Sequence, residues 1–106
     1  MIEGCDLTSA IGAVVYITGK DSAPVIRDCE IRDGKASGVF VFEQGQGTIE
    51  KCVISGNALS GVEIKQGGNP VVRDCEIRDG KGPGVYVFEQ GQGTIEQCVI
   101  LSLIHI

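Results

Sequence analysis

The chain repeats itself, and this repeat limits what it can fold into. Residues 24–54 and 70–100 align without a gap at an offset of 46, and 26 of their 31 positions are identical. A shorter period lies inside this one, because five cysteines follow one another at steps of 24, 23, 23 and 23 residues: Cys5, Cys29, Cys52, Cys75 and Cys98. A fixed period of this length is typical of a solenoid, in which each unit contacts only its neighbours.

The pattern of each 23-residue unit predicts three short strands and three turns. In one unit, residues 75–77, 84–88 and 94–96 carry alternating apolar side chains, and Gly, Asp, Pro and Gln fill the turns between them. The interval from Ile95 to Cys98 breaks the alternation and predicts a tight corner. With no helical periodicity, the pattern predicts an all-β fold: a right-handed, single-stranded parallel β-helix of about four and a half coils.

The repeat also suggests where the domain lies. We interpret residues 1–100 as one parallel β-helix fragment, because neither end carries a polar segment that would cap a terminal coil. Residues 101–106, with the sequence LSLIHI, replace the turn that the repeat requires. We interpret them as a non-native tail.

Charge alternation explains why the chain repeats every 46 residues rather than every 23. Stacked coils bring equivalent residues together, and the outward position two residues before each cysteine alternates in sign: Glu3, Arg27, Glu50, Arg73 and Glu96. Opposite charges on neighbouring strands are mildly favourable, and like charges are unfavourable. We therefore expect the charges to help fix the register, while burial of the Ile and Val columns holds the coils together.

The five cysteines form a line, one in each coil. Zinc needs ligands that converge on one point, and five thiols in a row cannot all pair as disulfides. We expect an inward column of free thiols with no metal and no cofactor. Reduced thiols favour a reducing, intracellular location in the cytoplasm or nucleus.

An alternative hypothesis is that the recurring Asp and Arg residues form a catalytic site. Sugar-cleaving β-helix enzymes use clustered acids or calcium, and Asp and Arg pairs recur near the turns here. However, the Asp-Gly pairs at 33–34 and 79–80 are turn signals, and the other pairs belong to charge columns. We expect no catalytic residues and no enzyme activity. The net charge of -5 argues against binding nucleic acid, and no apolar run is long enough to span a membrane.

The outward side of the middle strand is the candidate binding surface. Most coils present aromatic residues there, and one coil presents an acid and a base instead. The alternative is that these aromatic residues pack against turns or simply favour strands. The predicted binding residues are Tyr16, Phe40, Phe42, Glu63, Lys65, Tyr86 and Phe88.

Two phrases carry a family resemblance. GGNPVVRDCEIRDGKGPGVYVFEQGQGTIE, residues 67–96, and SGNALSGVEI, residues 55–64, resemble repeats of the NosD/pectate-lyase-like β-helix superfamily. They are most similar to the β-helix domain of F-box-only ubiquitin-ligase adaptors, in which asparagine often stands at the cysteine column. The resemblance implies a substrate-recognition surface whose partner proteins perform the chemistry.

These observations predict a non-catalytic β-helix module for protein recognition or scaffolding. The more specific prediction is that it recognises substrates within the ubiquitin conjugation pathway. Its partner is then a protein. The alternative is a carbohydrate-binding or carbohydrate-modifying β-helix with a glycan as its partner.

Overall fold

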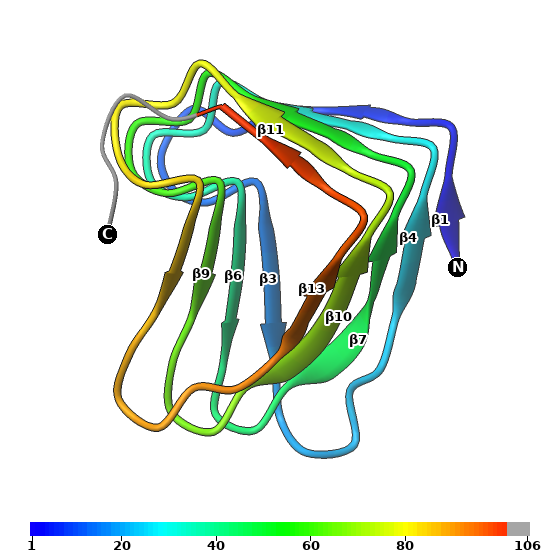
Figure 1. Cartoon of the computed structure of the whole chain (residues 1–106), viewed down its shortest axis with the longest axis vertical. Helices are drawn as coiled ribbons and strands as arrows, with labels where there is room; N and C mark the ends of the chain where they lie inside the picture. Colours follow the sequence, from blue (N-terminus) through cyan, green and yellow to red (C-terminus); the bar gives the residue numbers. More distant parts are fainter. Residues whose placement is uncertain (102–106) are drawn as a thin grey trace.

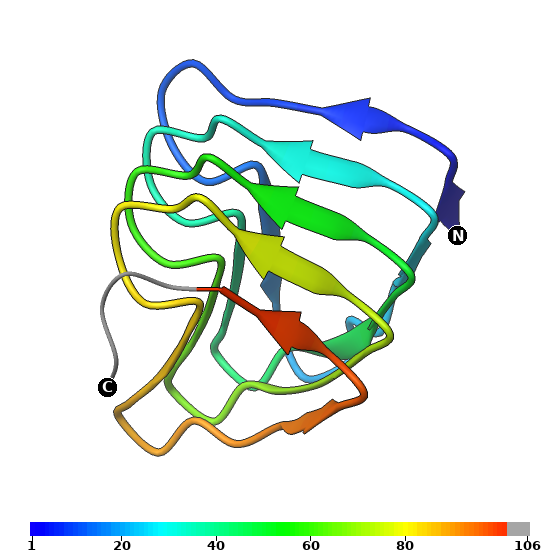
Figure 2. The same cartoon turned by 45° about the horizontal axis from the view of Figure 1, so that its top comes forward.

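The computed structural model describes residues 1–101, and the chain forms a stack of coils within them (Figure 1). Each coil contributes one strand to each of three parallel sheets, and successive coils lie side by side along the stack (Figure 2). The predicted all-β, parallel solenoid is therefore confirmed. Of the segment predicted to be a non-native tail, only Leu101 belongs to the described residues. Its N–H donates to the carbonyl oxygen of Ile77 at 2.8 Å.

The first sheet, sheet A, has the strand order β1 (Ile2–Glu3), β4 (Val25–Arg27), β7 (Gln46–Glu50), β10 (Asn69–Arg73) and β13 (Thr94–Glu96). Sheet B has the order β14 (Val99–Ile100), β11 (Glu76–Arg78), β8 (Val53–Ser55), β5 (Glu30–Arg32) and β2 (Asp6–Leu7). Sheet C has the order β12 (Val85–Val87), β9 (Val62–Ile64), β6 (Val39–Phe42) and β3 (Val15–Thr18). The cysteines lie just before the sheet B strands rather than inside them.

The register of the sheets follows the sequence period. Ile26 pairs with Ile49, and Ile49 pairs with Val72, so one apolar column runs through sheet A. Val39 and Val62 are paired in the same way in sheet C. All five of these side chains are buried. Because burial of one Ile or Val contributes about 1.5–3 kcal/mol, these columns are the main stabilising feature of the stack.

Left-handed backbone makes the corner between sheets A and B. The residue before every cysteine has a positive φ, between 53° and 67°: Gly4, Asp28, Lys51, Asp74 and Gln97. One such residue turns the chain without interrupting the stack, which confirms the corner predicted between Ile95 and Cys98. Most of these residues are not glycine, so the corner carries some backbone strain.

The cysteine thiols fill the inside of this corner. The Sγ of Cys52 donates to the carbonyl oxygen of Glu50 at 3.3 Å and to that of Ile26, in the preceding coil, at 3.6 Å. Cys29, Cys75 and Cys98 each make the equivalent pair of contacts. The column therefore needs a side chain that is small enough for the core and can donate a hydrogen bond.

The inward thiol column is confirmed for the middle coils and is wrong for the first one. Cys29, Cys52 and Cys75 are buried, and all five cysteines are free thiols. Cys5 is exposed and Cys98 is half-buried, because each lies in a terminal coil with a neighbouring coil on one side only.

A glycine column allows the turns between sheets B and C to pack closely. A Cβ atom on Gly38 would lie 2.7 Å from the carbonyl oxygen of Gly61, and one on Gly61 would lie 2.7 Å from that of Gly84. Real Cβ atoms do not approach backbone oxygen so closely. Glycine therefore recurs nine residues after the cysteine because the coils leave no room for a side chain.

Candidate functional site

Sheet C carries the predicted binding residues on its outer face. Val39 and Val41 are fully buried, so the alternation of β6 directs Phe40 and Phe42 away from the core. Register places Phe40 beside Glu63 and Glu63 beside Tyr86 in successive coils. We call this surface the aromatic strip. It consists of Tyr16, Phe40, Phe42, Glu63, Lys65, Tyr86 and Phe88.

The rings of the aromatic strip pack on one another. Tyr16 lies 6.0 Å from Phe40, and Phe40 lies 4.7 Å from Phe42, measured between ring centroids. Tyr86 and Phe88 are stacked at 4.6 Å. Both tyrosines remain exposed, whereas the three phenylalanines are half-buried by their neighbours. The outward orientation of these side chains follows from the alternation in the sequence. The packing of the rings on one another could not be predicted from that alternation.

Lys65 joins the two groups of rings. Its Nζ lies 5.3 Å from the centroid of Phe40 and 5.7 Å from that of Phe88, which belong to the coils on either side. Both distances are within the range of a cation–π interaction. The coil that lacks aromatic residues thus supplies the cation that bridges its neighbours.

Glu63 has a partner that sequence reasoning missed. The hydroxyl of Ser37, a buried turn residue, donates to Oε1 of Glu63 at 2.5 Å. This bond holds the carboxylate against the sheet between Phe40 and Tyr86. A serine in a turn of another coil gives no sequence signal for such a contact.

Acidic and amide residues border the strip where the strands of sheet C end. Glu43, Gln66 and Glu89 occupy equivalent positions in successive coils, and each has a left-handed φ between 48° and 51°. Gln66, Glu89 and Gln90 line an open hollow. Their turn-like sequence gives no signal of this position beside the strip.

Several charged residues outside the strip form ion pairs. Nε of Arg32 donates to Asp6 at 2.8 Å, and this hydrogen bond holds the pKa of Asp6 below its usual value. Arg78 bonds Glu76 and Asp79 in the same manner. In residues 1–101, no group of three or more His, Cys, Asp or Glu side chains is arranged to hold a metal ion.

The buried thiols are held mostly in their neutral form. Burial raises the pKa of Cys29, and hydrogen bonding to Cys52 together with burial raises the pKa of Cys75. A thiolate at Cys52 would receive a hydrogen bond from Cys75, which lowers the pKa of Cys52. Within this pair, the surroundings therefore favour the thiolate only at Cys52. Both thiols lie inside the core.

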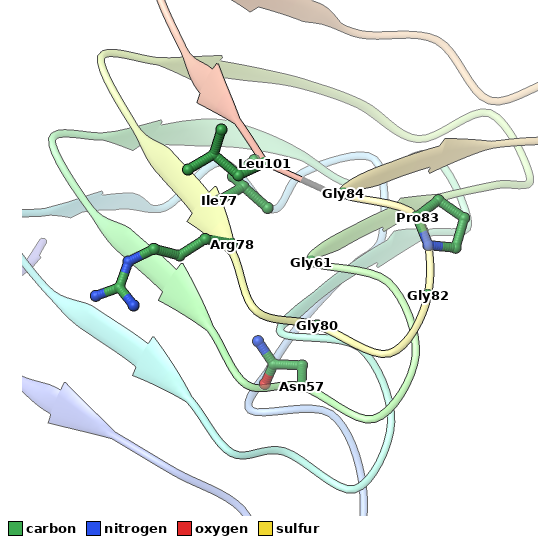
Figure 3. A pocket seen from close by; sticks show the side chains of 9 residues that line it. All are labelled: Asn57, Gly61, Ile77, Arg78, Gly80, Gly82, Pro83, Gly84 and Leu101. Atoms are coloured by element: carbon green, nitrogen blue, oxygen red, sulfur yellow. The ribbon is translucent and has the colours of Figure 1, made fainter. Parts of the chain in front are cut away.

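A small cavity of about 10 Å³ lies at the turn between sheets B and C (Figure 3). Asn57 lines it, together with Arg78, Leu101 and several glycines. The side-chain Oδ1 of Asn57 accepts from the N–H of Gly34 at 2.9 Å, whereas its buried Nδ2 has no hydrogen-bond partner among residues 1–101. The cavity has room for about one water molecule, so it is too small for a substrate.

Comparison with known proteins agrees with this architecture. The family described as "Right handed beta helix region" matches residues 1–102, and the chain belongs to that family. This match also gives the handedness expected from the sequence. In the described part of the chain, no helix has the length and apolar character needed to cross a membrane.

One curated relative is the F-box protein dre-1 of Caenorhabditis elegans. It is 44% identical over 62 residues, which cover 58% of this chain and 7% of dre-1. The chain thus spans a small part of that relative. No solved structure matches the chain.

Proposed function

We propose that the chain is a non-catalytic recognition module that binds a protein partner through the aromatic strip. The observation that carries this proposal is the strip itself: five aromatic rings and a bridging lysine gathered on the outside of one sheet. Aromatic residues are enriched among the anchors of protein interfaces, because they bury a large area at low entropic cost. Isolated exposed apolar residues would need no such explanation.

We further propose that the module recognises substrates within a ubiquitin-ligase adaptor, in an intracellular setting. The likeness to a segment of an F-box protein supports this more specific form, as do five unpaired cysteines. The full-length coding sequence tests this part: an F-box beside the β-helix agrees with it, whereas a secretory signal peptide contradicts it.

Replacement of Phe40 and Tyr86 together by serine tests the binding surface. Both side chains point away from the core, so the circular dichroism spectrum should change little, while the unfolding midpoint should fall modestly because ring contacts are lost. The wild-type chain first serves to isolate a partner, which is then purified. Its affinity for the double variant should fall about tenfold or more, which corresponds to about 1.4 kcal/mol.

The matched control replaces Val53 and Val99 by serine. These residues are equivalent to one another, lie two coils apart and face outward on sheet B. This control should bind the partner as the wild type does. A folded Phe40/Tyr86 variant that binds normally would place the recognition surface elsewhere. A panel of neutral oligosaccharides measured in parallel would assign a glycan instead if these ligands, and no protein, depend on the strip.

A further inference from the structure

We propose that the aromatic strip takes a cationic ligand: an extended protein segment with arginine at every third residue. This inference rests on the proposed function and specifies the chemistry of the partner. Three observations carry it, namely the cation already held by the rings, the negative charge around them and the spacing of the coils.

The rings of the strip already hold a cation. Lys65 places its ammonium group within 5.7 Å of the ring centroids of both Phe40 and Phe88. Aromatic faces attract cations through their negative quadrupole, and arginine is the commonest protein cation in such contacts. Tyr16 and Tyr86, at the two ends of the strip, are exposed and offer further ring surface to an incoming guanidinium.

Acidic residues outnumber basic ones on and beside the strip. The strands of sheet C and the turns that follow them are residues 15–21, 39–45, 62–68 and 85–91. They hold four carboxylates, of Asp21, Glu43, Glu63 and Glu89, and two ammonium groups, of Lys20 and Lys65. Glu43 and Glu89 are exposed, and the open hollow after the strands of sheet C is lined by Glu89 and the amides Gln66 and Gln90. This surface complements a basic segment and repels phosphate groups or acidic peptides.

The coil spacing sets the interval between the arginines. Coils stack about 4.8 Å apart, so Glu43 and Glu89, two coils apart, repeat at about 9.6 Å along the stack. A polyproline II segment has three residues per turn and rises about 3.1 Å per residue, so its side chains repeat on one face every 9.3 Å or so. Surfaces lined with aromatic residues are a known mode of binding such segments.

The probe is a synthetic peptide of four Pro-Pro-Arg triplets with blocked ends, titrated into the full 106-residue chain. Amide chemical-shift changes in a ¹H–¹⁵N spectrum locate the binding site and give the dissociation constant. We expect the shifts to centre on sheet C and the turns after it. Replacing every arginine by citrulline, which is neutral and nearly isosteric, should weaken binding at least tenfold. A peptide with glutamate in place of arginine should not bind.

Protein variants test whether the charge of the strip changes the affinity in the expected direction. Glu43→Gln together with Glu89→Gln should weaken binding of the arginine peptide about fivefold or more. Lys65→Met keeps the length of the side chain and removes a like charge, so it should strengthen binding about threefold. The matched control is Glu30→Gln with Glu76→Gln, two equivalent exposed carboxylates two coils apart on sheet B, which should have little effect.

Stronger binding of the glutamate peptide, or weaker binding by a folded Lys65→Met variant, would overturn the inference. So would equal binding of the arginine and citrulline peptides. The proposed function fails in a different way, through the Phe40/Tyr86 variant and the natural partner. If that variant loses the partner while the Glu43/Glu89 variant keeps it, recognition through the strip stands and the arginine-bearing ligand is wrong.

Discussion

The Nε of Arg73 lies 2.9 Å from a carboxylate oxygen of Glu50, its neighbour in the preceding coil. Glu50 also lies 3.6 Å from Arg27 on its other side, and Arg27 lies 3.3 Å from Glu3. The last contact is Coulombic rather than a directed hydrogen bond, since Nε of Arg27 has no hydrogen-bond partner in the described part of the chain. The residues of alternating charge are therefore neighbours in space, in a column that crosses the strands of sheet A near their C-terminal ends.

Arg27→Glu should place three carboxylates on consecutive rungs. We expect the free energy of unfolding to fall by about 1 kcal/mol, because exposed pairs are weak and like charges on neighbouring strands repel. Urea unfolding at low salt and at about 1 M salt measures this, and screening should restore part of the loss. Arg27→Gln is the control and should lose less. A loss that salt does not change would show that Arg27 acts through packing.

Gly61→Ala should destabilise the stack by about 1–3 kcal/mol, the usual cost of forcing extra volume into a packed site. The new Cβ would meet the carbonyl oxygen of Gly84, which is backbone and cannot move aside alone. Gly80→Ala is the matched control, since the nearest atom to its Cβ within residues 1–101 would lie 3.4 Å away. Thermal unfolding of both variants decides the point, and equal midpoints would mean that the glycine column is not a steric requirement.

Asn57→Ala should cost about 1–2 kcal/mol, because the buried N–H of Gly34 would lose its acceptor. Leu59→Ala, in the same turn, is the control, and its side chain is exposed. Urea unfolding measures both. A small, equal effect in the two variants would indicate that water replaces the amide oxygen of Asn57.

Thiol labelling should separate the cysteines by coil. We expect an aromatic disulfide reagent to label Cys5 first and Cys98 next, whereas Cys29, Cys52 and Cys75 react only as the chain unfolds. Mass spectrometry of the labelled peptides assigns each site, and full labelling in denaturant is the control. Early labelling of Cys52 would contradict the predicted protection, even though its pKa is lowered.

Stability should fall at alkaline pH. The folded pKa of Cys29 lies above the ordinary value of 9.0, so this thiol stays protonated in the fold while the unfolded chain ionises. In the Cys52–Cys75 pair the pKa of Cys75 is raised and that of Cys52 is lowered, so the two thiols act on stability in opposite directions. The contribution of Cys29 is complete below about pH 9 and is lost as the pH rises through its folded pKa. Urea midpoints between about pH 7 and 10 test this. Cys29→Ser, which keeps a donor that does not ionise, should flatten the decline.

The parts of the fold that repeat could be predicted from the sequence. The cysteine period gave the coil length, and the alternation around Val39 and Val41 gave the inward and outward faces, because each signal recurs in several coils. The contact between Ser37 and Glu63 could not be predicted in this way. It joins residues 26 positions apart in two different coils and depends on rotamers rather than on a period.

The exposure of residues in the terminal coils could not be predicted from the repeat either. Cys5 carries the same repeat signal as Cys52, yet it is exposed, because burial in a solenoid requires a coil on each side. The aromatic strip was predicted in position but not in detail. Lys65 was treated as an interruption of the strip, and it is instead the group that bridges Phe40 and Phe88.

The column of alternating charges on sheet A also restricts how such a chain can lengthen by duplication of its coils. Duplication of a single coil would place Glu50 beside a second Glu50, and Lys65 beside a second Lys65 on sheet C. Duplication of two coils would insert an Arg73 between the two copies of Glu50 and leave every neighbouring pair of this sheet A column opposite in sign. A gene that lengthens by tandem duplication is therefore expected to keep insertions of 46 residues and lose those of 23, so that the length of the solenoid increases in even steps.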